Sequence, residues 1–127
     1  MKPKIMFVND SINVLDSLKR FFKDAAYQFF GFNDPFKALD KMKEAEFAVV
    51  VADQNMSRID VIEFLKKANQ SSPNTVRIVM TSCFDLHKAS DALGNGLIYH
   101  FTKKPWNDLG LKQTVEMAIT HYKMRKM

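Results

Sequence analysis

Polar residues that could bind a phosphoryl group follow four separate apolar runs in this sequence. They are Asn9 with Asp10, then Asp53, then Thr81 with Ser82, and finally Lys104. Two carboxylates suit Mg²⁺, which prefers oxygen ligands and is commonly held by one or two carboxylates together with phosphate oxygens. A hydroxyl and an ammonium could bind the other side of the same phosphoryl group. The set predicts metal-assisted phosphoryl chemistry, provided that the fold brings the four points together.

Asp53 is the carboxylate whose position most needs an explanation. It follows Phe47–Ala52, an unbroken apolar run typical of a strand that is buried on both faces. A charge beside such a strand is costly to desolvate unless a partner compensates it. We expect Asp10 with a divalent ion, and Lys104, to provide that compensation.

The elements that must position these residues alternate between strand and helix along the chain. Strands are expected at Lys4–Val8, Tyr27–Phe32, Phe47–Ala52, Thr75–Met80 and Leu97–Phe101. Helices are expected at Ile12–Ala25, from Pro35 past Met42, from Val61 past Ala68, at 86–93, and from Asp108 past Tyr122. Such alternation predicts an α/β fold, a doubly wound five-stranded parallel sheet with helices on both faces. Ligands of these folds bind at the carboxyl ends of the strands, where all four polar groups fall.

The composition limits the class of protein. The chain has 127 residues, 46% of them hydrophobic, which predicts one globular domain. Its single cysteine, Cys83, excludes an intramolecular disulfide and favours a cytoplasmic location. No apolar run approaches a membrane-spanning length, so no membrane partner is expected. The net charge of +5 comes mostly from lysines and arginines at helical spacing, so direct binding of nucleic acid is not expected either.

In their order and spacing, these motifs resemble the receiver domain of response regulators in bacterial two-component systems. The motifs are Asn9-Asp10, the run DQNMSRIDV at 53–61, Thr81-Ser82, and FTKKPW at 101–106. Each motif is weak alone, but together they stand in order, each at an expected strand end. The resemblance implies a CheY-like (flavodoxin-like) sheet with strand order 2-1-3-4-5. It assigns residues 1–122 to the receiver and 123–127 to the end of the last helix or the start of a linker.

The resemblance also implies a role for each site residue. Asp53 would be the phosphoacceptor, and Mg²⁺ or Mn²⁺ would be bound by Asp10, Asp53 and the backbone carbonyl of Asn55, with Asn9 acting indirectly. The phosphoryl-binding and switch residues would be Thr81, Lys104 and Phe101, while Ser82 and Cys83 would tune the lifetime of the phosphorylated state. The chain would be a signalling phosphoacceptor and not an enzyme, apart from its own phosphorylation and slow self-dephosphorylation.

The implied partners are a sensor histidine kinase or a phosphotransfer protein. Phosphorylation would alter the face formed by the fourth helix (86–93), the fifth strand (97–101) and the last helix. That face would serve an output partner or a homodimer. The sequence does not identify the cognate kinase or the output.

Three residues depart from the family pattern. Asn9 replaces an acid, Ser57 a proline and Val61 a glycine. Asn9 removes a negative charge, so we expect weakened metal binding and surviving phosphorylation. Ser57 could instead cap the helix from Val61, and Val61 is expected to pack in the core.

Other interpretations remain open at this stage. Asp10 could cap the first helix, and Thr81 could merely end a strand. The whole chain could be a degenerate receiver that binds a partner without phosphorylation. An aspartyl-nucleophile phosphatase is a further rival, but Asn55 stands where such enzymes carry a second acid.

Overall fold

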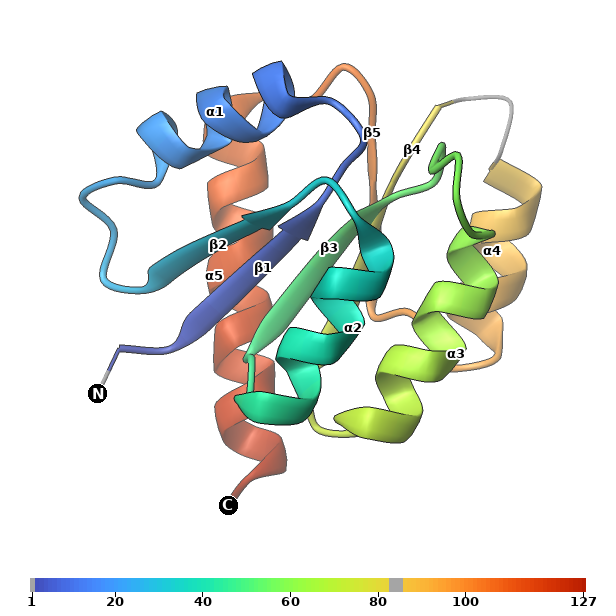
Figure 1. Ribbon diagram of the computed structural model, residues 1–127. Coiled ribbons are helices and arrows are strands. Elements are labelled where there is room, and N and C mark those ends of the chain that lie inside the picture. The colour runs from blue at the N-terminus through green and yellow to red at the C-terminus, as the bar shows by residue number, and fades with distance from the viewer. Residues whose placement is uncertain (1, 83–85) are drawn as a thin grey trace.

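The computed structural model describes residues 2–82 and 86–127, which form one parallel sheet with helices on both sides (Figure 1). The strands are β1 Lys4–Val8, β2 Gln28–Phe32, β3 Val49–Asp53, β4 Val76–Thr81 and β5 His100–Lys103. The helices are α1 Ile12–Phe21, α2 Pro35–Glu44, α3 Val61–Ser71, α4 Leu86–Gly94 and α5 Asp108–Arg125. All pairings are parallel, in the order β2-β1-β3-β4-β5. The predicted fold class and strand order are confirmed.

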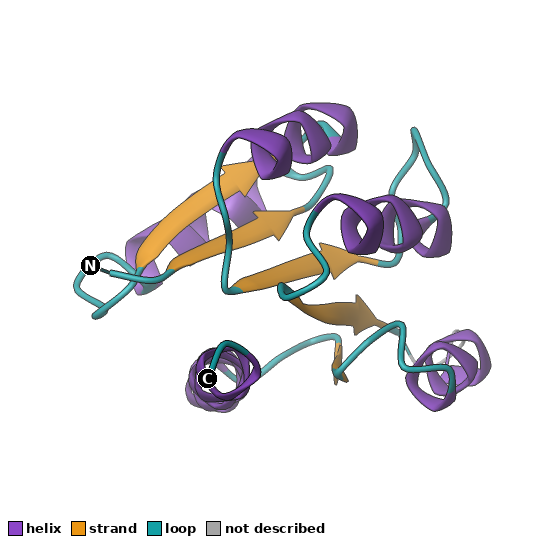
Figure 2. Ribbon diagram, turned by 90° about the horizontal axis from the view of Figure 1, so that it is seen from below, coloured by secondary structure: helices purple, strands orange, loops and turns teal. Residues whose placement is uncertain are grey.

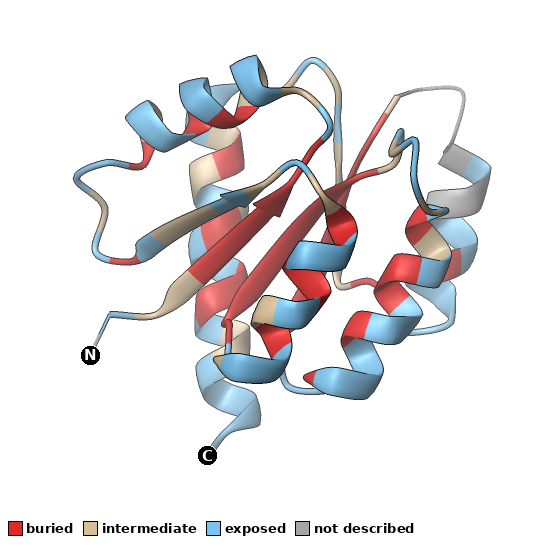
Figure 3. Cartoon of the chain, viewed as in Figure 1, coloured by how far each residue is buried: buried red, intermediate tan, exposed pale blue. Residues whose placement is uncertain are grey.

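Two apolar clusters lie on opposite faces of the sheet, between the two layers of helices seen in Figure 2. One cluster joins α1 and α5 to the sheet, and the other joins α2, α3 and α4 to it. All five residues of β3 are buried (Figure 3), because this central strand has a strand on each side and helices on each face. The strand therefore holds Asp53, its last residue, in a fixed position.

The helix starts follow local capping chemistry, which decides two alternatives that the sequence left open. Ser11, and not Asp10, caps α1, because its Oγ accepts a hydrogen bond from the backbone N–H of Val14 at 3.3 Å. Asp60, and not Ser57, caps α3. The side chain of Asp10 and the backbone of Ser57 are thereby available for another contact, which occurs at the candidate site.

The fifth strand begins three residues later than predicted. The backbone N–H groups of Leu97 and Ile98 both donate to the carbonyl of Ala92, at 2.9 and 3.3 Å, so they close the end of α4. The first bond toward β4 runs from Tyr99 N to Arg77 O at 2.7 Å. The apolar run at 97–98 belongs to the core without being a strand, which is why apolar pattern alone misplaced it.

The first helix is shorter than predicted and ends at Phe21 instead of Ala25. Phe22 lies just beyond the helix, yet only 2% of it is exposed, and its ring lies 5.5 Å from that of Phe7 and 6.2 Å from that of Phe29. The apolar pattern continues past the helix because Phe22 packs in the core from the connecting turn.

The longest helix, α5, has apolar residues on two sides. Its core side consists of Leu111, Val115, Ala118 and Ile119. On the other side, Met117 and Met124 are each 63% exposed. The helix runs on to Arg125, past the predicted domain boundary at 122, which stays a prediction. Among residues 2–82 and 86–127, no helix combines the length and apolar character needed to cross a membrane.

Candidate functional site

The strand register brings all four groups of polar residues to one edge of the sheet. Val8 pairs with Ala52, so Asn9 and Asp10 follow β1 beside the end of β3, where Asp53 lies. Asp53 pairs with Met80, one residue before Thr81. Thr81 in turn pairs with Lys103, one residue before Lys104. The juxtaposition predicted from the sequence is therefore confirmed for the strand ends.

Lys104 compensates the charge of Asp53. Its Nζ lies 2.6 Å from Oδ1 of Asp53, and only 7% of Asp53 is exposed. The backbone N–H of Asn55 also donates to Oδ1, at 3.3 Å. Lys104 follows β5 directly, and its own N–H donates to the carbonyl of Thr81 at 2.8 Å. The ammonium is thus positioned by both its backbone and its side chain.

The two oxygens of Asp53 have different surroundings. Both hydrogen bonds fall on Oδ1, and no residue in the described part of the chain donates to Oδ2. An ionised carboxylate has acceptor capacity on both oxygens. Oδ2 therefore keeps its lone pairs for another electrophile or cation.

Asn9 and Asp10, which follow β1, make different contacts. Asn9 is buried and its Oδ1 accepts from the N–H of Ser11 at 2.9 Å, an arrangement typical of a turn before a helix. Asp10 is exposed, and its Oδ2 accepts from the N–H of Ser57 at 2.9 Å. Asp10 therefore ties the end of β1 to the β3–α3 loop, 47 residues further along the chain.

A second ion pair holds the same loop. The guanidinium of Arg58 lies 2.7 Å from Oδ2 of Asp34 and 5.2 Å from the ring of Phe36. Desolvation raises the pKa of Asp34, but the hydrogen bond from the Phe36 N–H and the charge of Arg58 outweigh it and hold that pKa below its usual value. The sequence analysis missed Arg58, because nothing local relates it to a residue 24 positions earlier.

The hydroxyl of Thr81 contacts a residue that the sequence analysis also missed. Thr81 is fully buried, and its Oγ1 donates to Oε1 of Gln54 and lies 3.1 Å from the carbonyl of Ser82. Gln54 is half-buried and follows Asp53 directly, and its N–H donates to the carbonyl of Met80 at 2.9 Å. Its polar type just after a buried strand was the signal available in the sequence.

The comparison with known families decides the identity of this arrangement. The sequence model described as "Response regulator receiver domain" matches residues 5–116. The chain belongs to this family. Receiver domains of response regulators are signalling phosphoacceptors, not classical enzymes, and they interact with histidine kinases or phosphotransfer proteins and generally bind Mg²⁺ at the acidic pocket.

Curated relatives are longer than this receiver. The transcriptional regulatory protein FixJ of Bradyrhizobium diazoefficiens is 32% identical over 119 residues, which cover 93% of this chain and 57% of that protein. The transcriptional regulatory protein ZraR of Klebsiella oxytoca is 28% identical over 120 residues, which cover 94% of this chain and 27% of that protein. The chain therefore spans between about a quarter and somewhat more than half of these relatives.

Solved structures match the whole receiver. The crystal structure of adenylate cyclase from Rhodopirellula baltica has a TM-score of 0.95 at 26% identity, and the match covers 99% of this chain and 93% of that one. The signal receiver domain of an HD domain-containing protein from Pseudomonas fluorescens gives 0.89 at 26% identity, covering 98% and 92%. A CheY-like receiver from Methanospirillum hungatei gives 0.90 at 21% identity, covering 98% and 99%, and shares the fold.

The oxygen ligands that the receiver offers near Asp53 are few, but they fit a magnesium ion. Asp10 and Asp53 offer two carboxylates, and the exposed Asn55, two residues after Asp53, offers a backbone carbonyl. Within the described ranges, no group of three His, Cys, Asp or Glu side chains could hold a metal. Mg²⁺ needs only one or two carboxylates, because waters and phosphate oxygens complete its octahedron.

Of the remaining predicted residues, Phe101 and Ser82 lie in the part of the receiver that the structure describes. Phe101, within β5, is partly buried, packs against the cluster of α2, α3 and α4, and stacks on His100 with ring centroids 6.1 Å apart. Ser82 is half-buried and follows β4. Cys83 lies outside the described residues. Val61 is buried, so its expected packing role is confirmed.

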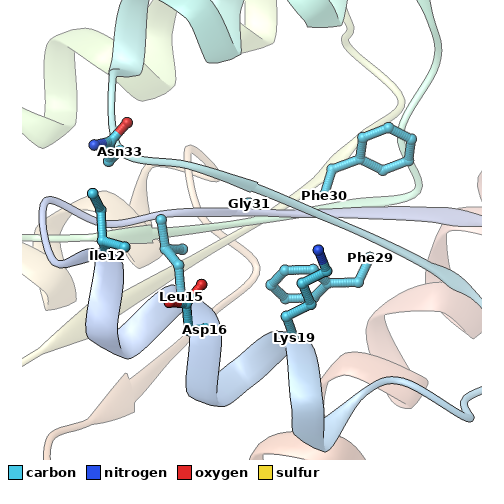
Figure 4. A pocket seen from close by; sticks show the side chains of 8 residues that line it. All are labelled: Ile12, Leu15, Asp16, Lys19, Phe29, Phe30, Gly31 and Asn33. Carbon is cyan, nitrogen blue, oxygen red and sulfur yellow. The ribbon is translucent and has the colours of Figure 1, made fainter.

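The receiver also has a groove away from Asp53, between α1 and β2. The groove is lined by Ile12, Leu15, Asp16 and Lys19 of α1 and by Phe29, Phe30, Gly31 and Asn33 (Figure 4). Its volume is about 400 Å³. Gly31 forms its floor, since a Cβ there would lie 3.1 Å from Cε1 of Phe29. None of the predicted site residues lines this groove.

Proposed function

We propose that this receiver accepts a phosphoryl group on Asp53 from the phosphohistidine of a histidine kinase or of a phosphotransfer protein. The observation that supports it most is the 2.6 Å ion pair between Lys104 and Asp53 at the end of a fully buried central strand. A lysine in that position offsets the charge of the buried Asp53 carboxylate, and it lies where the charge of an incoming phosphoryl group must be neutralised. The proposal implies a cytoplasmic location, where such donors are phosphorylated.

In the transfer step, Oδ2 of Asp53 attacks phosphorus. The bond between phosphorus and the donor's imidazole nitrogen breaks, and its electron pair returns to that nitrogen, which then takes up a proton. Asp10, Asp53 and the carbonyl of Asn55 would hold Mg²⁺ or Mn²⁺, which supplies positive charge to the phosphoryl oxygens, and Asn9 would contribute through water. Lys104 moves its ammonium toward a phosphoryl oxygen, a short step from Oδ1.

The phosphoryl group adds about −1.5 to −2 charges at neutral pH, enough to shift a balance of a few kcal/mol. In this proposal Thr81 donates its hydroxyl to the new oxygen, and Phe101 repacks behind it. Ser82 and Cys83 control how water reaches the acyl phosphate.

A second copy of this chain is the proposed occupant of the face formed by α4, β5 and α5. Leu93 is 41% exposed and Met117 and Met124 are 63% exposed on this face. A shallow hollow of about 260 Å³ lies between the two methionines and Tyr99. Exposed apolar area of this kind is a common mark of an interface.

Charge complementarity favours a second copy over an unrelated partner. Glu116 and Lys123 directly precede the two exposed methionines Met117 and Met124 along α5, two turns apart, and neither has an ion pair in the described part of the chain. If two α5 helices cross antiparallel between these positions, Glu116 meets Lys123 of the partner subunit, and symmetry repeats the pair.

The decisive experiment is labelling with a small phosphodonor followed by intact-mass measurement. Wild type in Mg²⁺ should gain the mass of one phosphoryl group, and Asp53→Asn should gain none. An unmodified wild type, or equal labelling of the two proteins, would refute the phosphoacceptor proposal.

Asn9 favours a second candidate, the degenerate receiver that signals by binding alone. It leaves the site with one negative charge fewer than the family pattern. That candidate predicts no mass gain from any phosphodonor, and an unchanged oligomeric state when Asp53 is replaced by Asn.

A further inference from the structure

The hydroxyl of Thr81 already donates a hydrogen bond to Gln54, before any phosphoryl group is present on Asp53. Thr81 has one hydroxyl proton to donate, and that proton points to Oε1 of Gln54, with the carbonyl of Ser82 as the other acceptor in reach. A hydrogen bond to a phosphoryl group on Asp53 would need the same proton. The two uses exclude each other.

We propose that Gln54 is a positioning residue that holds the Thr81 hydroxyl in the resting arrangement and so weakens the response to phosphorylation. The inference rests on the proposed role of Asp53 and deepens it. It assigns to Gln54 a function that the resemblance to receiver domains did not imply.

Backbone hydrogen bonds hold Thr81 in place, so its response to phosphorylation is limited mainly to rotation of its side chain. The Thr81 carbonyl accepts from the N–H of Lys104 at 2.8 Å, and the N–H of Gln54 is bound to the carbonyl of Met80 at 2.9 Å. Thr81 is fully buried, and a β-branched side chain has few χ1 positions. The competition therefore lies between two rotamers of one side chain.

Gln54 suits a latch that can be released. It is half-buried, so its amide can turn to water once Thr81 leaves, and it carries no charge that would need a new partner. Releasing one neutral hydrogen bond changes an equilibrium by roughly twofold to twelvefold. The latch tunes the switch without blocking it.

Removing the acceptor should therefore favour the activated arrangement. Gln54→Met keeps the length of the side chain and lacks the amide. With Mg²⁺ present, we expect this variant to bind beryllofluoride, a phosphoryl mimic, roughly twofold to twelvefold more tightly than wild type. Trp106, two residues after Lys104 and partly buried, reports the binding by fluorescence. Gln70→Met, an exposed glutamine on α3, is the matched control and should bind like wild type.

A double-mutant cycle separates positioning from a general structural effect. Thr81→Val removes the hydroxyl at nearly constant volume, and in that background Gln54→Met should no longer change the affinity. Thr81→Ser keeps the hydroxyl and should keep the effect. Should Thr81→Val unfold, Thr81→Ala completes the same cycle.

The outcomes distinguish this inference from the proposed function. If wild type binds beryllofluoride and Gln54→Met binds it equally or more weakly, the latch is wrong and the phosphoacceptor stands. An equal gain in the Thr81→Val background also overturns the latch. If neither wild type nor Gln54→Met responds, both proposals fail.

Discussion

Lys104 and Asp53 form an ion pair of 2.6 Å in which the lysine side chain is 24% exposed and the aspartate side chain 10% exposed. The pair is nearly removed from water, so either charge alone would be poorly solvated. The folded state therefore depends on the same contact that the proposed chemistry uses.

Replacing Lys104 should cost both stability and binding. Lys104→Met leaves Asp53 without its cation, and we expect a loss of roughly 1–3 kcal/mol in the free energy of unfolding, together with weaker binding of beryllofluoride. Urea unfolding measures the first effect. Lys103→Met, on the exposed neighbouring residue, is the control. The double variant Asp53→Asn/Lys104→Met should lose less than the sum of the single variants, and strict additivity would contradict the coupling.

Restoring a carboxylate at position 9 should strengthen metal binding. Asn9→Asp adds a negative charge at the end of β1, and even screened by water such a charge attracts a divalent ion by about 1–2 kcal/mol, roughly tenfold in affinity. Titration of Mg²⁺ against Trp106 fluorescence measures it. Asn95→Asp, an exposed residue after α4, adds the same charge elsewhere and should change little. Equal affinities for wild type and Asn9→Asp would show that metal binding does not depend on the acid that the family pattern has at position 9.

Charge exchange on α5 tests the proposed dimer. Glu116→Lys and Lys123→Glu should each weaken self-association in beryllofluoride, because each creates two repulsive pairs across the symmetric interface. The double variant should restore it. Sedimentation velocity measures the monomer–dimer balance, with Lys66→Glu on α3 as the control. A monomeric wild type at all concentrations would exclude the second copy as the occupant.

Tyr27 provides a pH test of the core. Burial, with a contribution from the charge of Glu116, raises its pKa from 10.0 to about 12, and its hydroxyl is buried without a hydrogen-bond partner in the described part of the chain. The folded state keeps the proton that the unfolded chain releases above pH 10.0. Stability is therefore lost as the pH rises from the unfolded toward the folded pKa, by up to roughly 2–3 kcal/mol.

The variant Tyr27→Phe should lack this alkaline loss. At neutral pH it should be as stable as wild type or more stable, because it removes an unsatisfied hydroxyl. Urea unfolding of both proteins at neutral pH and near pH 11 measures the difference. Parallel decreases in the two proteins would assign the alkaline loss to other groups.

The apolar pattern of the sequence was enough to predict the sheet, but not the first and last residues of every strand and helix. Alternating apolar runs predicted a parallel sheet and the edge at which Asp53 and Lys104 meet, whereas the strand order came from the resemblance to receiver domains. The start of β5 was misplaced, since the buried Ile98 and the partly buried Leu97 close the end of α4 and do not pair with β4. Burial and strand pairing produce the same apolar signal in a sequence.

The contacts within the site were less accessible from the sequence. The bond between Asp10 and Ser57 joins residues 47 positions apart, and each residue had a plausible local use as a helix cap. Gln54 was overlooked because its contact with Thr81 depends on how the end of β3 lies beside the end of β4. Such pairings are decided by register and rotamer, which composition and spacing do not record.

The contacts around the site close into a ring. Asp53 binds the side chain of Lys104, the N–H of Lys104 binds the carbonyl of Thr81, the hydroxyl of Thr81 binds Gln54, and Gln54 is joined to Asp53 by the chain itself. A disturbance at Asp53 therefore has two routes to Thr81, one through each neighbouring strand. Breaking one contact leaves the other arm in place, so Thr81 loses its last connection to Asp53 only when both arms are broken, although a single break still alters how strongly the two residues are coupled.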